Sequence, residues 1–376
     1  MSEATTEAGA TAEWAICDDV IQLREWGNGR VHILPTSLVD TVLIGTSREC
    51  SLQLDDAHAS RKHAQLTFER GKWLIRDLGS RNGLRQDNAR RNEFTLDPGI
   101  EVSLGNTTLI AESRRSIELR NFCARLLGWA SDRAATVDQA MRTLRLAATR
   151  RTALVLHGES DLVPIAHALH QRVLGADRPF SVCDPRRHTV RASVRSTAND
   201  EIGMLALASV AGGSLCVRSQ RLPSDFSSLL DKLRDSDARS QLFVCSNGSG
   251  HRHDFLPAPI VVPPLRERTT EIPRIIEEYV RDAIAALGIM SVNLLAADYL
   301  WIREHANTLP EIEKAASRLV AVRTSPTHSD AADRLGMAPV SLSRWLGRRS
   351  SSPMLQRTER AHTRWPIPNR SRAKSA

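Results

Sequence analysis

The stretch from Ile44 to Gly83 constrains the fold most, because short apolar runs alternate there with loops rich in small and charged residues. Gly45 closes one predicted strand, Ser60-Arg61-Lys62-His63 leads into another, and Ser80-Arg81-Asn82-Gly83 leaves a third. Hydroxyls, guanidinium groups and an amide on loops between strands can surround a phosphate, because charge-assisted hydrogen bonds are strong. This stretch therefore predicts a β-rich domain with an anion-binding rim.

Turn-forming pairs divide the surrounding sequence into short segments. Breaks fall at Arg70-Gly71, Asp97-Pro98-Gly99 and Gly105-Asn106. Many short strands separated by such turns predict an all-β sandwich. We expect it to occupy residues 15–115, after a disordered amino terminus at residues 1–14. The candidate strands span residues 31–34, 41–44, 51–54, 64–69, 72–77, 101–104 and 106–111.

The motif segment resembles a forkhead-associated (FHA) domain, a β-sandwich that binds phosphothreonine peptides. The resemblance implies that Ser60 bonds the phosphate and that Arg61, which follows it, adds charge. Asn82 matches the asparagine that bonds the peptide backbone beside the phosphothreonine, and Gly83 permits the tight turn after it. His63 matches a histidine that braces the loop through its ring nitrogens.

Two positions depart from the family pattern. Thr46 stands where an arginine usually follows the first glycine, and Arg81 stands where a threonine usually precedes the asparagine. One cation leaves the rim and another enters, so phosphate binding is expected to survive with altered geometry. The alternative is a sandwich that binds no phosphopeptide, because two misplaced donors at roughly 1.5–3 kcal/mol each would remove most of the affinity. The expected phosphopeptide-binding residues are Thr46, Ser60, Arg61, Arg81 and Asn82.

The middle of the chain predicts an α/β domain. A helical stretch at 117–150 precedes a buried strand at 153–157, a turn at 158–160 and a helix at 165–174, which is the setting of a phosphate-binding P-loop. The sequence LVLHGESDLVPIAHALHQ resembles the sigma-54 activators, bacterial enhancer-binding proteins with AAA+ ATPase domains. Further matches at 263–273 and 307–322 extend the resemblance over roughly residues 125–323. It implies an AAA+-like P-loop fold at 116–265 and a helical lid at 266–323.

The catalytic residues of that family are missing. A P-loop needs Gly-x4-Gly-Lys-Ser/Thr, but counting from Gly158 the last three positions hold Val163, Pro164 and Ile165. Aligned instead on the helix, the loop is about two residues short. Neither alignment supplies a lysine, and proline removes a donor N–H.

Three further losses fall along the same apparatus. Arg218 and Ser219 follow the strand at 213–217, where magnesium-binding acids are expected. About 22 residues between Phe180 and Ile202 leave no room for the sigma-contacting loop, and no lid arginine lies near Leu309. Phosphoryl transfer depends on positioning and charge neutralisation. We therefore expect no enzyme, no catalytic residues and no cofactor, and a domain that serves in packing and assembly, with a homo-oligomeric ring as one option.

The segment at 326–349 resembles the Fis-type helix-turn-helix that ends most sigma-54 activators. Ser329 or Asp330 can cap its first helix, Gly336 makes the turn, and Leu342 and Leu346 lie four residues apart on a buried face. Helices of this motif enter the major groove. The alternative is an amphipathic helix pair that closes the lid. The expected DNA-binding residues are Ser341, Ser343, Arg344, Arg348 and Arg349.

The excess positive charge is confined to the carboxyl end. Residues 344–376 hold nine Lys or Arg and one acid, and removing these from totals of 51 and 43 leaves 42 basic and 42 acidic residues elsewhere. We expect 350–376 to be a disordered basic tail that contacts a polyanion such as nucleic acid. A tail that only adds solubility is the alternative.

Composition places the chain in a reducing compartment. The six cysteines form no CxxC pair and do not suggest a disulfide framework. Cys245, His251 and His253 lack a fourth ligand at suitable spacing, so no metal site is predicted. The start of the chain has no signal core, and the longest apolar run, 202–217, is too short to span a bilayer. We expect a cytoplasmic protein without a membrane partner.

Together these features predict a phosphothreonine-responsive, DNA-binding transcriptional regulator with an inactive ATPase domain. Its partner would be a phosphothreonine-containing protein, such as a Ser/Thr kinase substrate, or the chain itself. It would repress, or assemble with an active sigma-54 activator paralogue. Two alternatives stay open: a phosphopeptide adaptor without DNA binding, and an unorthodox ATP-dependent remodeller.

Overall fold

The computed structural model describes residues 16–35, 41–150, 152–192, 197–235, 240–247, 256–292 and 294–347. One compact unit reaches Pro263, and a second begins at Pro264. None of the helices within the described ranges has the length and apolar character needed to cross a membrane. Several predictions fall on residues outside these ranges: the amino terminus 1–14, the tail 350–376, Arg348, Arg349, His251 and His253.

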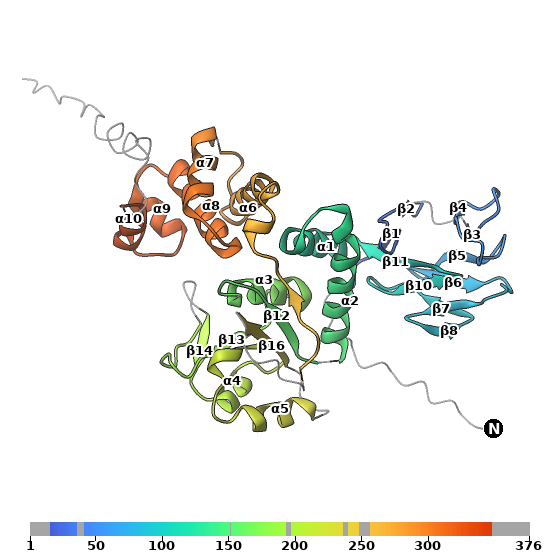
Figure 1. Cartoon of the computed structure of the whole chain (residues 1–376), viewed down its shortest axis with the longest axis horizontal. Coiled ribbons are helices and arrows are strands. Elements are labelled where there is room, and N and C mark those ends of the chain that lie inside the picture. Colours follow the sequence, from blue (N-terminus) through green and yellow to red (C-terminus); the bar gives the residue numbers. More distant parts are fainter. Residues whose placement is uncertain are drawn as a thin grey trace, which may run out of the picture. The chain divides into compact units, whose positions relative to one another are not determined.

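The first unit opens with the two-layered β-sandwich (Figure 1), which confirms the all-β prediction. One sheet has the order β2-β1-β11-β10-β7-β8 and the other β4-β3-β5-β6-β9. Apolar side chains from both sheets, among them Leu23, Ile44, Leu66, Ile75 and Leu104, are fully buried between them. The strands are β1 (Val20–Glu25), β2 (Val31–Ile33), β3 (Val42–Gly45), β4 (Leu52–Gln53), β5 (Ala64–Glu69), β6 (Lys72–Asp77), β7 (Leu84–Gln86), β8 (Ala89–Arg91), β9 (Glu93–Thr95), β10 (Glu101–Leu104) and β11 (Thr107–Ser113).

Four of these strands, β1, β7, β8 and β9, were not expected from the sequence. Strand β8 shows why, because its residues Ala-Arg-Arg are all exposed and give no apolar alternation. It pairs with β7 through a two-residue turn at Asp87 and Asn88, whose φ angles are 46° and 73°. Such positive angles are typical of the type I′ hairpin turn. The hairpin is therefore indicated by its turn residues and not by the residues of its strands.

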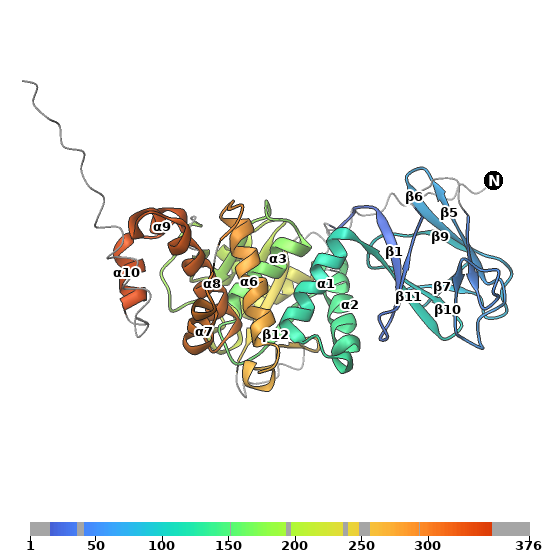
Figure 2. The ribbon, with the colours of Figure 1, turned by 90° about the horizontal axis from the view of Figure 1, so that it is seen from above.

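Two helices follow the sandwich, α1 (Arg114–Leu127) and α2 (Ala134–Arg150), joined through a short 3-10 turn, η1 (Ser131–Arg133). They lie side by side (Figure 2). The hydroxyl of Ser113 accepts a hydrogen bond from the N–H of Ser116 and caps α1. Residues 117–150 are thus helical as expected, with a break at the glycine that ends α1.

The rest of the first unit is a parallel sheet with helices on both faces, a mixed α/β region as predicted. Its strand order is β14-β13-β15-β16-β12-β17, and every neighbouring pair is parallel. Helix α3 lies on one face, where the ring of His170 packs against Phe180. The core of the opposite face joins sheet residues to α4 and α5, with Leu207 and Leu229 among them. The elements are β12 (Leu154–His157), α3 (Val163–Val173), β13 (Phe180–Cys183), β14 (Ala198–Asp200), α4 (Gly203–Ser209), β15 (Ser214–Arg218), η2 (Ser219–Arg221), α5 (Phe226–Arg234), β16 (Gln241–Ser246) and β17 (Ile260–Val261).

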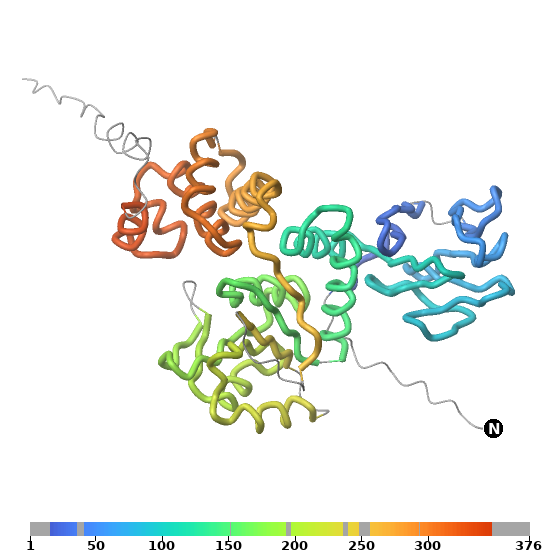
Figure 3. Tube along the Cα trace, in the orientation of Figure 1, coloured from blue at the N-terminus to red at the C-terminus, as the bar shows by residue number. Residues whose placement is uncertain are grey.

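The second unit is helical throughout its described residues (orange to red in Figure 3). Its last two helices, α9 and α10, pack around Ala332, Leu342 and Leu346. The elements are η3 (Leu265–Glu267), α6 (Ile272–Ala286), α7 (Ala296–His305), α8 (Leu309–Thr324), α9 (His328–Arg334) and α10 (Pro339–Gly347).

Candidate functional site

Three loops at one end of the sandwich are tied together by hydrogen bonds. In the loop after β3, the N–H of Thr46 donates to the carbonyl of Ser60 over 3.1 Å, and the N–H of Ser47 donates to the carbonyl of Arg61 over 3.0 Å. The third loop, between β6 and β7, joins them because the N–H of Arg81 donates to the Ser60 hydroxyl over 3.0 Å. Residues distant in sequence thus form one polar face, which we call the loop face, made of the loops after β3, β4 and β6.

Gly45 allows the first two loops to approach so closely. A Cβ atom at this position would lie 2.3 Å from the carbonyl oxygen of Arg61 and 2.8 Å from that of Ser60. Both atoms belong to the backbone, so no side-chain adjustment could relieve the clash. Gly83 meets a second requirement at the end of the third loop, because its φ of +74° lies in the region that favours glycine.

His63 braces the loop face from below. Its ring is fully buried, with Nδ1 accepting from the N–H of Ser60 over 3.1 Å and Nε2 lying 3.2 Å from the carbonyl oxygen of Gly83. A carbonyl can only accept, so Nε2 carries the proton and the ring fits the neutral tautomer. His63 therefore has the bracing role expected of it and no free nitrogen for a ligand.

Asn82 is fixed by one half of its amide. Its Nδ2 donates to the carbonyl of His58 over 2.7 Å, and no donor among the described residues bonds the side-chain oxygen. An oxygen in this position can accept a hydrogen bond from a backbone N–H of a bound peptide. The structure thus brings Asn82 together with Thr46, Ser60, Arg61 and Arg81, all five of the residues predicted for the phosphopeptide.

Asp56 supports the same face and was missed in the sequence. Its carboxylate accepts from the N–H groups of His58, Asn106 and Thr107 at 2.9, 2.6 and 2.8 Å, which ties the loop before β5 to the turn before β11. Burial raises the pKa of Asp56, but these hydrogen bonds outweigh burial and hold the pKa below its usual value. An aspartate bonding the N–H two residues later is a local turn signal that could have drawn attention to it.

Three arginines of the loop face form no ion pair within the described residues. Arg61 and Arg81 are exposed, and within the described part of the chain neither forms an ion pair. Arg48, on the first loop, is likewise exposed and without an acidic partner in that part of the chain. Lys62, by contrast, contacts Glu49 over 2.9 Å. The loop face therefore offers guanidinium groups beside a positioned hydroxyl, an arrangement suited to phosphate.

The residues predicted to bind DNA occupy a different element. Ser341, Ser343 and Arg344 are exposed on α10, while Leu342 and Leu346 are buried. Helix α9 does not begin with a Ser329 or Asp330 cap. Its N-cap is Thr327, whose hydroxyl accepts a hydrogen bond from the N–H of Asp330. This bond satisfies one of the unpaired N–H groups at the start of the helix. Ser329 lies inside the helix and cannot make it.

The turn after β12 is occupied by the protein's own groups. Pro164, the second residue of α3, has no N–H, and the N–H of Val163 donates to the Asp161 carboxylate over 3.3 Å. Arg218, which stands where magnesium-binding acids were expected, pairs with Asp161 at 3.1 Å and with Asp184 at 3.2 Å. In the described ranges, no cluster of three or more His, Cys, Asp or Glu side chains is arranged to hold a metal ion.

Comparison with known proteins identifies a family for the β-sandwich. The FHA domain family matches residues 42–105. The FHA domain-containing protein FhaB of Mycobacterium tuberculosis is 38% identical over 69 residues, which cover 18% of this chain and 44% of FhaB. The oxoglutarate dehydrogenase inhibitor of Corynebacterium efficiens is 33% identical over 70 residues, 19% of this chain and 49% of that protein.

This chain thus spans less than half the length of either curated relative. A solved structure described as a structural and functional analysis of phosphothreonine-dependent FHA domain interactions is 28% identical, with a TM-score of 0.23, and covers 25% of this chain and 95% of its own. The family match and the β-sandwich lead to one identification. Residues 42–105 form an FHA domain.

Proposed function

We propose that this chain is a phosphothreonine-responsive regulator whose loop face captures a phosphothreonine on a partner protein. The observation that carries the proposal is the combination of a fixed hydroxyl at Ser60 with two unpaired cations, Arg61 and Arg81, in the described structure. The planar guanidinium group matches the geometry of a phosphate and can bind it through two hydrogen bonds. Here the ligand would be the phosphate.

The contacts determine how the phosphopeptide would bind. The Ser60 hydroxyl already accepts from the Arg81 N–H, so its own hydrogen is free to donate to a phosphate oxygen. The guanidinium groups of Arg61 and Arg81 would add charge-assisted hydrogen bonds, and the Thr46 hydroxyl lies on the adjoining loop. Asn82 would accept from the peptide backbone, because its amide nitrogen is held by His58.

A peptide titration tests this part of the proposal. The full chain is titrated with degenerate peptide libraries that carry phosphothreonine, phosphoserine or unmodified threonine at one fixed position. We expect only the phosphothreonine library to bind measurably, and binding to weaken on Asn82→Ala. Thr67→Ala serves as the control, because Thr67 bonds Glu69 on β5 and belongs to none of the three loops. Equal binding of phosphorylated and plain libraries would refute the proposal.

We further propose that α9 and α10, with the basic residues after them, bind DNA, and that the chain regulates transcription in the manner of a sigma-54 activator without its ATPase. Support comes from the exposed Ser341, Ser343 and Arg344 on a helix that buries Leu342, and from the basic composition of 344–376. A mobility shift with genomic fragments should detect binding that falls steeply with salt. Deletion of 344–376 should abolish it.

The α/β region would act in assembly and not in ATP hydrolysis. Support comes from the absence of a lysine in the turn after β12 and from Arg218, which occupies the position where magnesium-binding acids are expected. We propose that this region contacts other copies or an active sigma-54 activator paralogue. A magnesium-dependent ATPase activity that disappears on deleting 158–165 would contradict this.

The competing function is that of an FHA adaptor without DNA binding. One observation favours it: Arg344 is the single basic residue of α10 (Pro339–Gly347). The mobility shift discriminates between the two, because an adaptor would bind phosphopeptide normally and leave all genomic fragments unshifted.

A further inference from the structure

The α/β region contains a pocket at the carboxyl edge of its sheet. Its volume is about 570 Å³, and its lining comes from segments that directly follow the parallel strands β12, β13, β15 and β16. Ligands of open α/β sheets bind outside the carboxyl ends of the strands, and pockets of roughly 300–1,000 Å³ hold small molecules. Location and size therefore both fit a small ligand.

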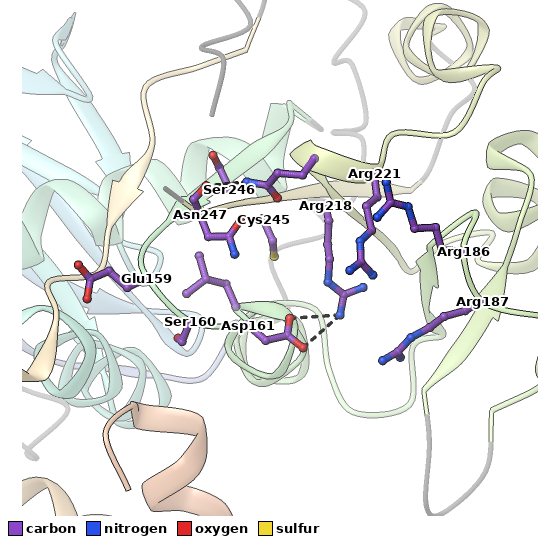
Figure 4. Close-up of a pocket in the computed structure, with 12 residues that line it drawn as sticks. Glu159, Ser160, Asp161, Arg186, Arg187, Arg218, Arg221, Cys245, Ser246 and Asn247 are labelled. Atoms are coloured by element: carbon purple, nitrogen blue, oxygen red, sulfur yellow. Dashed lines mark hydrogen bonds and ion pairs between the residues drawn. The ribbon is translucent and has the colours of Figure 1, made fainter. Parts of the chain in front are cut away.

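Four arginines line one end of this pocket: Arg186 and Arg187 follow β13, Arg218 ends β15, and Arg221 ends η2 (Figure 4). Arg218 is largely covered and engaged, since its guanidinium bonds Asp161 and Asp184. Arg221 bonds Asp184 over 3.1 Å but remains 39% exposed. Arg186 has no acidic side-chain partner in the described ranges, and Arg187 comes no closer than 3.9 Å to Asp184 and is 64% exposed.

Asp184 organises this cluster from beneath. Its carboxylate is fully buried and accepts from the Arg186 N–H over 3.1 Å as well as from Arg218 and Arg221. Burial raises the pKa of Asp184, but these hydrogen bonds and the two guanidinium charges hold the pKa below its usual value. The carboxylate therefore stays ionised and holds the guanidinium groups of Arg218 and Arg221 and the backbone of Arg186.

The charges at this end do not balance. Four guanidinium groups meet two carboxylates, Asp161 and Asp184, while Glu159 lies at the other end of the pocket (Figure 4). Like charges held together in a concave site raise the local potential for an anion. Guanidinium groups with free donors bind phosphate in a bidentate manner.

The start of α3 is a poor place for the same anion. The Val163 N–H is taken by Asp161, Pro164 has no N–H, and the Asp161 charge would repel a phosphate there. The hydroxyls of Ser160 and Ser246 and the amide of Asn247 line the rest of the pocket and can bond an uncharged polar group.

We propose that this pocket binds a small phosphate-bearing molecule without a metal ion, with Arg186, Arg187 and Arg221 holding its phosphate groups. The ligand carries at least two negative charges, because the four guanidinium groups at this end exceed the two carboxylates, Asp161 and Asp184, by two. Its uncharged part is polar, because hydroxyl and amide groups line the remaining wall.

The test uses inorganic pyrophosphate as the probe, titrated calorimetrically into the full chain in EDTA. Every protein sample in this experiment also carries Arg61→Ala and Arg81→Ala, which remove phosphate binding at the loop face. We expect saturable one-to-one binding, weakened at least tenfold by Arg186→Gln with Arg187→Gln. Both residues are exposed and make no side-chain ion pair within 3.5 Å, so the variant is expected to fold.

A matched control removes two exposed arginines elsewhere, Arg85→Gln with Arg114→Gln, and should leave the affinity unchanged. Three results would overturn the proposal: no binding of pyrophosphate in this background, equal weakening by the control pair, or binding that requires magnesium. The phosphopeptide titration is unaffected by any of them, so the FHA proposal is judged separately.

Discussion

Arginines in two regions of the first unit have opposite surroundings. Arg24, at the junction of the sandwich with α2, is buried and bonds Glu112 at 2.8 Å and Asp138 at 2.5 Å, with both carboxylates also buried. Arg61 and Arg81 on the loop face are exposed and form no ion pair in the described structure. Paired arginines stabilise the fold, whereas unpaired ones are free for a ligand. The pocket at the carboxyl edge of the parallel sheet combines the two cases. Arg218 is largely covered and bonds two carboxylates, whereas Arg187 is largely exposed.

The largest effect should follow from breaking the junction. Asp138→Ala would leave Arg24 buried with half of its partners, and removing one member of a buried ion pair costs about 3–5 kcal/mol. We expect the free energy of local opening, measured by hydrogen exchange in β1 and α2, to fall by about that amount. Phosphopeptide affinity should not change.

The exposed Asp132, in the turn before α2, supplies the control. Asp132→Ala should alter the same free energy by no more than about 0.5 kcal/mol. If Asp138→Ala were as mild as Asp132→Ala, the distinction between paired and unpaired arginines would lose its energetic basis.

A smaller and pH-dependent effect is expected at Asp184. Because its folded-state pKa lies below the unfolded value of about 3.9, its ionised form stabilises the fold at neutral pH. That contribution is complete well above pH 4 and is lost as pH falls toward the folded pKa. Asp184→Asn should cost about 2 kcal/mol at pH 7, less than a fully buried pair because Arg221 is partly exposed.

Urea titrations of the wild type and Asp184→Asn at pH 7, 5, 4 and 3 measure this difference. We expect the two unfolding curves to converge as pH falls below 4. Asp231→Asn, which changes a carboxylate that is 75% exposed, should show no such convergence. A constant difference at every pH would mean that Asp184 acts by packing and not by charge.

On the loop face the effect should appear in binding and not in stability. Ser60→Ala removes one charge-assisted hydrogen bond to the phosphate, worth roughly 1.5–3 kcal/mol, which corresponds to about a 10- to 150-fold higher Kd. Fluorescence anisotropy with a phosphothreonine peptide measures the change. A Kd within twofold of the wild type would remove Ser60 from the phosphate site.

The smallest effect is expected on α10. Arg344→Gln should lower the slope of log affinity against log salt by about 1 and weaken DNA binding equally for all sequences. Arg303→Gln, an exposed substitution on α7, is the control. A change confined to one DNA sequence would instead indicate that Arg344 contacts a base.

The sequence predicted those features that local chemistry encodes. Gly83 could be placed because a tight turn with a positive φ favours glycine, and the bracing role of His63 followed from the resemblance to FHA domains. Strands β5 and β6 were predicted at their observed bounds, since apolar residues bounded by Arg70-Gly71 define a hairpin.

Features that depend on pairing between distant residues were not predictable. Asp138 lies 114 residues from Arg24, and Asp184 gains its importance only when β13 and β15 bring Arg218 and Arg221 to it. A single carboxylate in a helix or after a strand has no distinguishing pattern. The pocket at the carboxyl edge of the parallel sheet therefore could not be predicted, because the topology of the sheet assembles it. Of its four arginines, the sequence singled out Arg218.

The junction at Arg24 has a practical consequence for anyone who isolates the phosphopeptide module. Truncation after residue 115 would end the polypeptide at the last strand, and Asp138 and Arg142 would be lost with the helices. Arg24 would then lose one carboxylate and Glu101 its guanidinium partner. Expression of the fragment through Arg150 retains these contacts and should give the better-behaved sample.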